Sequence, residues 1–196
     1  MEKFYRYILS VDDGHAPCSD NGLLTLGTCK PTIRRCACVG DYVAGYMPSR
    51  LGEGSLVWFG KIERLISHRD YQREFQDRQD ANYRYNVGAE KPTRVDPNYH
   101  SDDPQLEQDI RYPVLIFDMK NSWYFGSEPK QPPEWLDQLK AAGQGHRVNF
   151  RVDRDIEQMV QWLCTVGLPG IHGNPRDEYN DNCKSNCIRI DAKQGC

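Results

Sequence analysis

The sequence predicts an α+β fold in which a mixed or antiparallel sheet, partly closed on itself, is flanked by helices. Segments rich in aromatic and β-branched residues fill most of positions 3–67 and return at 112–126. Helical signals are confined to positions 67–79 and to the chain after position 131. The order of strands, then a polar stretch, then strands and helices predicts one domain and not a repeated βαβ unit.

Four strands are expected in the N-terminal third. The segments are KFYRYILSV at 3–11, LLTLGTC at 23–29, GDYVAGYM at 40–47 and SLVWFGKIERLIS at 55–67. The turn-forming residues 12–22 predict a loop, and Gly60 is expected at a bulge. Pro31 restrains the residue before it to extended geometry, so the stretch after Cys29 is expected to be a strand edge. Ile33 and Arg35 would then share one face, with Arg34 on the other.

The rest of the chain predicts a polar insertion between two structured parts. Ser67 is expected to cap a helix over 68–79. Residues 76–112 are polar and contain three prolines, which predicts a long surface excursion. Strands are expected over 112–118 and 122–126, and helices over 132–143 and from Asp153 onward. The predicted organisation is a single domain at 1–175 and a cysteine-containing tail at 176–196.

Composition limits the cellular location and the kinds of binding partner that we expect. The chain has 196 residues, 38% hydrophobic and 27% charged residues, a formal net charge of -3 and eight cysteines. A protein that coats duplex DNA is usually basic overall, so any nucleic-acid contact requires a local basic patch. No apolar run is long enough to span a membrane and no signal peptide is visible, so a cytoplasmic location and reduced thiols are expected. The cysteine spacing fits no common zinc module, and no metal site is predicted.

A basic cluster forms the first candidate binding site. Lys30, Arg34 and Arg35 lie close together, and an arginine fork matches phosphate oxygens bidentately. The functional interpretation is therefore a phosphate-binding edge. The alternative, a solvated strand edge guarded by charge, is equally compatible with the spacing.

Candidate acid–base residues come from three segments. His100 ends the polar insertion, and His146 lies beside Arg147 in the expected loop GQGHR. A loop histidine beside an arginine can act as a general base or phosphate ligand, although lone surface histidines are commoner. Asp13 is a candidate carboxylate base, with turn capping as the alternative.

Aromatic residues supply a candidate base-binding wall. Trp123, Tyr124 and Phe125 could stack a nucleotide base, or they could simply build the core. No phosphate-binding loop, dinucleotide fingerprint, nucleophile elbow or zinc-deaminase pattern occurs.

Several of these blocks occur in an order that resembles the second of the nucleotide modification associated domain families, found in phages and bacteria. They are DDGHAP, TLGTCKPTIRRCACVGDYVAG, LVWFGKI, NYH, PVLIFDMKNSWYFG, GQGHR and WLCTVGLPGIHGNP, covering roughly residues 3–175. Thr28 stands where the family pattern has a further cysteine, which speaks against a vicinal-thiol or metal role. The matching positions are Asp13, Gly14, Pro17, Cys29, Lys30, Pro31, Arg34, Arg35, Gly40, Asp41, His100, Tyr124, Phe125, Gly126, Gly145, His146 and Arg147.

The resemblance implies a nucleotide- or DNA-directed protein. We expect an enzyme with a cationic phosphate-binding pocket, in which Asp13, His100 and His146 are catalytic. Lys30, Arg34, Arg35, Trp123, Tyr124, Phe125 and Arg147 would bind the substrate. The strand pair over 40–63 also looks like the hairpin of PUA-like and EVE-like domains, a fold-level analogy that implies the alternative of a modified-base reader. A third possibility is a protein partner bound through residues 76–112. The sequence identifies no cofactor.

Overall fold

The computed structural model describes residues 2–52, 54–140, 146–149 (backbone only) and 153–177. Its main sheet has seven strands in these residues, in the order β2-β7-β4-β3-β1-β8, and β9 pairs with β7. The strands β1 and β3 are parallel, as are β7 and β9, while the other neighbours are antiparallel. Their bounds are β1 Phe4–Ile8, β2 Thr25–Leu26, β3 Tyr42–Tyr46, β4 Leu56–Ile66, β7 Val114–Tyr124, β8 His146–Asn149 and β9 Gly170–Ile171.

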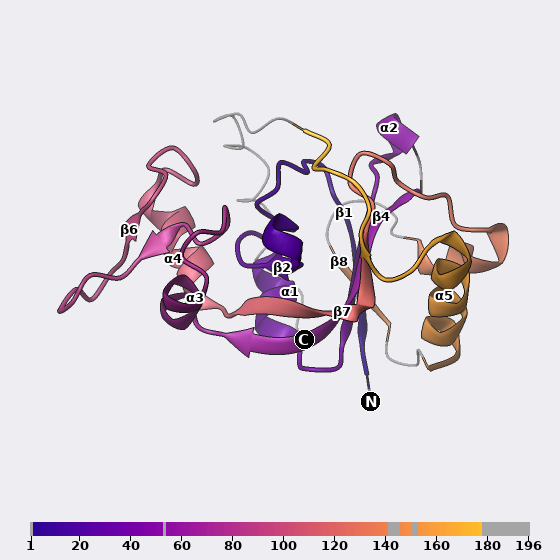
Figure 1. The fold of residues 1–196 in the computed structure, drawn as a ribbon, viewed down its shortest axis with the longest axis horizontal. Coiled ribbons are helices and arrows are strands. Elements are labelled where there is room, and N and C mark those ends of the chain that lie inside the picture. Colours follow the sequence, from indigo (N-terminus) through magenta and orange to yellow (C-terminus); the bar gives the residue numbers. More distant parts are fainter. Residues whose placement is uncertain (1, 53, 141–145, 150–152, 178–196) are drawn as a thin grey trace.

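Helices and a small second sheet complete the fold, which confirms the α+β prediction and the mixed, curled sheet (Figure 1). The strands β5 and β6 form a separate antiparallel pair. The α-helices are α1 Pro31–Cys36, α2 Ser49–Gly52, α3 His68–Glu74, α4 Asp103–Arg111 and α5 Asp153–Val166. The remaining elements are the 3₁₀ turns η1 Asp20–Gly22 and η2 Glu134–Leu139, and the short strands β5 Tyr83–Arg84 and β6 Thr93–Arg94.

Two hydrophobic clusters lie on opposite faces of the sheet. On one face Phe4, Phe59 and Trp123 pack against α5 and η2, and on the other Tyr5, Tyr7 and Trp58 pack against α1. Figure 1 shows α5 and α1 on these two sides of the sheet. Alternation along the strands places neighbouring side chains on opposite faces, so every central strand serves both clusters.

The predicted bulge at Gly60 is confirmed, because the pairing of β4 with β7 shifts register between Gly60 and Ile62. Ser67 also caps α3 as predicted, since its side chain accepts a hydrogen bond from the backbone of Asp70. In the part of the chain that the structure describes, no helix combines the length and apolar character needed to cross a bilayer.

Gly45 is expected to be essential for packing beneath β3. A Cβ atom at this position would lie 2.4 Å from Nε1 of Trp58, a side chain that is fully buried and donates to Tyr7 Oη at 3.1 Å. Gly45→Ala should therefore lower the free energy of unfolding by about 2–3 kcal/mol in urea titration, the scale of core overpacking. Gly167→Ala is the matched control, because its Cβ would meet only ordinary contact at 3.4 Å. Equal stability of the two variants would contradict the prediction.

The expected strand edge after Cys29 is wrong, because residues 31–36 form α1. Proline suits the first turn of a helix, where its missing N–H is not needed. The chain reverses immediately before it: Cys29 and Lys30 have φ of 55° and 42°. On the helix, Arg34 is buried and Arg35 exposed.

The expected surface excursion over 76–112 is also wrong as a description of the whole segment. It contains β5, β6 and α4, and together with α3 it forms the lobe of residues 68–111 at the left of Figure 1. Many of its polar side chains are buried, namely Arg78, Asp80, Asn82, Tyr83, Tyr99, His100, Gln105 and Asp109. The expected loop around His146 is instead strand β8, paired with β1. The predicted tail lies outside the described residues from position 178 onward.

Candidate active site

A thiol, an imidazole and a carboxylate line up where the lobe meets the sheet. Cys29 Sγ lies 3.5 Å from His100 Nε2, and His100 Nδ1 lies 2.5 Å from Asp109 Oδ2. The three residues come from the turn before α1, the loop before α4 and α4 itself. This is the order of nucleophile, base and orienting carboxylate that activates a weak nucleophile in covalent catalysis.

The backbone around these side chains is held in uncommon conformations. Cys29, Lys30 and His100 all have positive φ, which costs energy for residues other than glycine. Contacts from the lobe hold the turn in place, because the Cys29 amide donates to Asp109 Oδ1 at 3.0 Å. The helix that carries this carboxylate is capped at its start by Asp102, which accepts from the Gln105 amide at 2.7 Å.

Asp109 is the centre of this arrangement. Besides Cys29 and His100, its carboxylate accepts from Tyr83 Oη at 2.6 Å and faces Arg34 Nη1 at 3.6 Å. Burial acts to raise the pKa of Asp109, but the hydrogen bond and charge of His100, followed by Arg34 and Tyr83, outweigh burial and hold this pKa below its usual value. The carboxylate is therefore ionised and able to orient His100.

The contacts of His100 assign its tautomer. Nδ1 faces an ionised carboxylate and so carries the proton, which it donates to Asp109. Nε2 is left facing the thiol of Cys29, where it can accept the thiol proton. The pair can then exist as thiolate and imidazolium, the reactive form of a paired cysteine.

Arg34 connects α1 to the end of α4. It is fully buried, and it donates to the carbonyls of Pro113 at 2.9 Å and Tyr112 at 2.6 Å, as well as to the Asp109 carbonyl. It also meets His68 Nε2 at 2.7 Å; burial and then the Arg34 charge lower the pKa of His68 to about 3, so His68 is neutral and accepts. Every hydrogen bond described for Arg34 is thus made to another residue of the protein.

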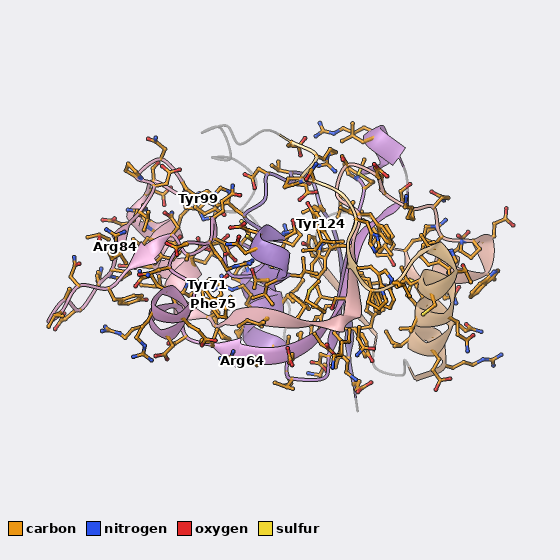
Figure 2. All side chains as sticks on the ribbon, viewed as in Figure 1. Arg64, Tyr71, Phe75, Arg84, Tyr99 and Tyr124 are labelled. Atoms are coloured by element: carbon orange, nitrogen blue, oxygen red, sulfur yellow. The ribbon has the colours of Figure 1, made fainter. Side chains whose placement is uncertain are left out.

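A column of three stacked rings includes His100. Tyr99 stacks on His100 with ring centres 4.2 Å apart, and His15 stacks on Tyr99 at 4.1 Å. The Tyr99 hydroxyl is bound to Thr28 Oγ1 at 2.6 Å, and Figure 2 shows Tyr99 on the side of the lobe that faces the sheet. Asp13 lies at the far end of the column, 3.4 Å from His15 Nδ1.

A lysine and a second buried carboxylate lie beside tyrosine side chains of the sheet. Lys30 Nζ stands 4.7 Å from the ring centre of Tyr7. Burial raises the pKa of Tyr7, and the charges of Asp12 and Cys29 raise it further. Asp12 is fully buried and accepts from Tyr124 Oη at 3.0 Å. Burial raises the pKa of Asp12 to about 6, despite the opposing hydrogen bond of Tyr124.

Asp12 is expected to weaken the fold at neutral pH. Its folded pKa of about 6 lies above the ordinary value of 3.8, so the unfolded chain releases this proton first and stability falls as pH rises from 4 to 6. Asp12→Asn should therefore gain stability relative to the parent across this window, by about 3 kcal/mol at pH 7. Urea titrations of both proteins at several pH values measure the difference. A difference that is constant from pH 4 to 7 would contradict the prediction.

The other expected site residues do not gather at this point. Trp123 donates to the Gly167 carbonyl at 2.9 Å and packs, with Phe125, toward α5, whereas Tyr124 faces the opposite cluster. Arg35 is exposed on α1. The side chains of His146 and Arg147 lie outside the described residues, and their roles stay predictions.

The described cysteines differ in state and setting. Cys18, Cys29, Cys38 and Cys164 are free thiols, as expected, whereas Cys36 is disulfide-bonded, so the expectation of reduced thiols is wrong there. Within the described ranges, no three histidine, cysteine or acidic residues are arranged to hold a metal ion.

Sequence reasoning placed His100 and Lys30 in the site but assigned no catalytic role to Cys29 or Asp109. The available signal for Cys29 was its place in the CKP block. Asp109 lies 80 residues away within a polar segment, where nothing local distinguishes it from a solvated carboxylate.

Comparison with known families decides the relationship. A family model described as nucleotide modification associated domain 2 matches residues 1–113. The chain belongs to this family. The match includes Cys29, His100 and Asp109, and it ends before the aromatic block at 123–125. No curated protein and no solved structure gives a significant match. Membership in the nucleotide modification associated domain 2 family links the protein to nucleotide modification.

Proposed function

We propose that this protein is an enzyme that modifies a nucleotide or a DNA base through a covalent intermediate on Cys29. His100 is the general base, and Asp109 positions His100. The observation that carries the proposal is the alignment of the three groups, with the thiol 3.5 Å from Nε2 and the carboxylate 2.5 Å from Nδ1. The family supplies the substrate class.

The steps follow from the contacts. Nε2 of His100 takes the thiol proton, the thiolate attacks the substrate, and the imidazolium returns the proton to the departing or developing anion. Asp109 keeps its negative charge and stabilises the imidazolium. Lys30, next to the nucleophile, and Arg35, exposed on α1, supply the positive charge that attracts an anionic nucleotide.

A non-enzymatic reader is the alternative. Three aromatic residues were expected to form its walls, namely Trp123, Tyr124 and Phe125. Each is at most 1% exposed, and they are distributed over the two hydrophobic clusters. A reader also has no use for a thiol aligned with a histidine and a carboxylate. These observations favour the enzyme.

Alkylation by iodoacetamide tests whether Cys29 is activated. An ordinary thiol loses about 100-fold in alkylation rate between pH 8 and pH 6, because its thiolate fraction falls. We expect the alkylation rate of Cys29 to fall less than about threefold over the same pH range. Peptide mass spectrometry measures this rate. Cys29 is only 8% exposed, so limited access lowers its alkylation rate by the same factor at every pH. The ratio of the rates at pH 8 and pH 6 therefore measures activation alone. Glutathione alkylated in parallel is the reference.

The variant His100→Asn is the control for this experiment. Asparagine tolerates the positive φ at this position but supplies no base. Its Cys29 should follow the glutathione profile. If Cys29 of the parent protein already does so, the proposed activation is wrong.

A second assay separates enzyme from reader. The protein is incubated with nucleotides and with plain and modified DNA, in the presence of common group donors, and substrate masses are recorded. A new mass that disappears in Cys29→Ser supports the enzyme. A shift in melting temperature that both proteins share, without any new mass, indicates a reader instead.

A further inference from the structure

A thiolate beside a nucleotide has three kinds of electrophile to attack: phosphorus, the sugar carbon C1′ and the base. The turn that follows Cys29 is poorly suited to a phosphoryl group. A thiolate that attacks phosphorus is best served by a nest of successive backbone N–H donors around the phosphoryl oxygens. Here Pro31 has no N–H, and the Arg34 amide donates to the Lys30 carbonyl at 3.1 Å.

The sugar carbon is also a poor fit to these residues. Glycosidic bonds are broken by a pair of carboxylates, one of which acts as acid and the other as base or nucleophile. The Asp109 carboxylate, which accepts from the Cys29 amide, is occupied by bonds from Cys29, His100 and Tyr83. It is therefore not available to a sugar, and the base is left as the target.

Among the bases, pyrimidines present the electrophile that a thiolate prefers. Their C5=C6 bond is conjugated with the group at C4, so a soft nucleophile adds at C6, whereas purines have no equivalent bond. We propose that Cys29 adds through Sγ to C6 of a pyrimidine nucleotide, which makes C5 the position that is modified. This inference rests on the proposed function and narrows its substrate class.

The step balances without any further reactant. The thiol proton passes to His100 Nε2, and the Sγ–C6 bond forms as the C5=C6 electron pair moves to C5 and into the ring. C5 then takes a proton from the imidazolium or from water. In reverse, C5 loses a proton, the double bond forms again and Sγ leaves as thiolate. The net result is exchange of the C5 hydrogen with solvent.

The surroundings of the thiol suit the charge that this step creates. Addition at C6 pushes negative charge onto the ring nitrogen and the C4 substituent, and proton donors or cations there lower the barrier. Lys30 directly follows Cys29 in the chain, and its ammonium lies 4.7 Å from the ring centre of Tyr7.

Deuterium exchange at C5 tests the inference without knowledge of the group donor. The probes are dCMP, dUMP and a single-stranded oligonucleotide containing both bases, incubated in D₂O with a phosphine as the only reductant. We expect one mass unit of gain on at least one probe, at least about 100-fold faster than in buffer. The nucleotide dTMP, which has no C5 hydrogen, should gain nothing.

Variants assign the exchange to the thiol. Cys29→Ser and His100→Asn should both reduce it to the buffer rate, whereas Cys38→Ser, at an exposed thiol, should retain it. A deoxynucleotide of 2-pyrimidinone, which is more electrophilic at C6, should add its mass to the peptide containing Cys29. Circular dichroism confirms that each variant is folded.

The outcomes separate this inference from the proposed function. An activated Cys29 in the alkylation profile, with no C5 exchange and no 2-pyrimidinone adduct, overturns the pyrimidine assignment and leaves covalent catalysis standing. An ordinary alkylation profile overturns both. Exchange that persists in Cys29→Ser also overturns the inference, because another group would then be the nucleophile.

Discussion

Replacing Asp109 by asparagine is expected to slow the alkylation of Cys29 at pH 6 by about 100-fold. An asparagine amide can present its N–H to Nδ1 of His100, which would move the imidazole proton to Nε2. The nitrogen that faces the thiol at 3.5 Å would then be unable to take its proton. Iodoacetamide rates at pH 6 and pH 8, measured by peptide mass spectrometry, give the effect.

The matched control for this variant lies on the same helix. Glu107→Gln removes a carboxylate that is 57% exposed and pairs with Lys91 at 2.6 Å, so it changes charge without touching the site. Its alkylation profile should equal that of the parent protein. Loss of reactivity in Glu107→Gln equal to that in Asp109→Asn would show a general charge effect and contradict the positioning role.

Replacing Arg34 by methionine is expected to lower the free energy of unfolding by about 3–5 kcal/mol. The substitution keeps an unbranched side chain but leaves the Asp109 carboxylate and the carbonyls at the end of α4 without their buried donor. Removing one partner of a buried charged network costs more than the network itself contributes. Urea unfolding followed by circular dichroism measures the loss.

Arg35→Met gives a direct comparison. It changes the same residue type on the same helix at an exposed position, so its effect on stability should stay within about 0.5 kcal/mol. If the two variants were equally stable, the buried bonds of Arg34 would not be what holds α1 against α4.

Hydrophobic pattern was sufficient to predict the long strands and the longest described helix. The strands β1, β3, β4 and β7 and the helix α5 all appear where apolar periodicity places them. The short helix α1 was missed because Pro31 was interpreted through its effect on the residue before it. In the structure its fixed φ begins the helix, and Lys30 takes a left-handed conformation that no periodicity reveals.

The lobe and the site were harder to predict for one physical reason. Composition distinguishes polar from apolar side chains, but it does not show which polar groups satisfy one another in the interior. Arg78, Asp80 and Tyr71 are bonded together below the surface, as are Arg34, Tyr83 and Asp109. Such networks have the composition of solvent-facing chain. His100 was found because histidine is chemically distinctive, whereas Asp109 resembles any other aspartate.

Because the site is divided between the sheet and the lobe, the reactivity of Cys29 depends on how stably the lobe is docked. The thiol belongs to the turn on the sheet, and its base and carboxylate belong to the lobe. Separation of the lobe from the sheet would break the hydrophobic cluster that joins Tyr71 to Ile66 and Val114. It would leave the clusters on the two faces of the sheet in place, and Cys29 would lose its base. The reactivity of Cys29 therefore reports how much of the protein has its lobe docked on the sheet. Local separation of the lobe can cost less free energy than global unfolding.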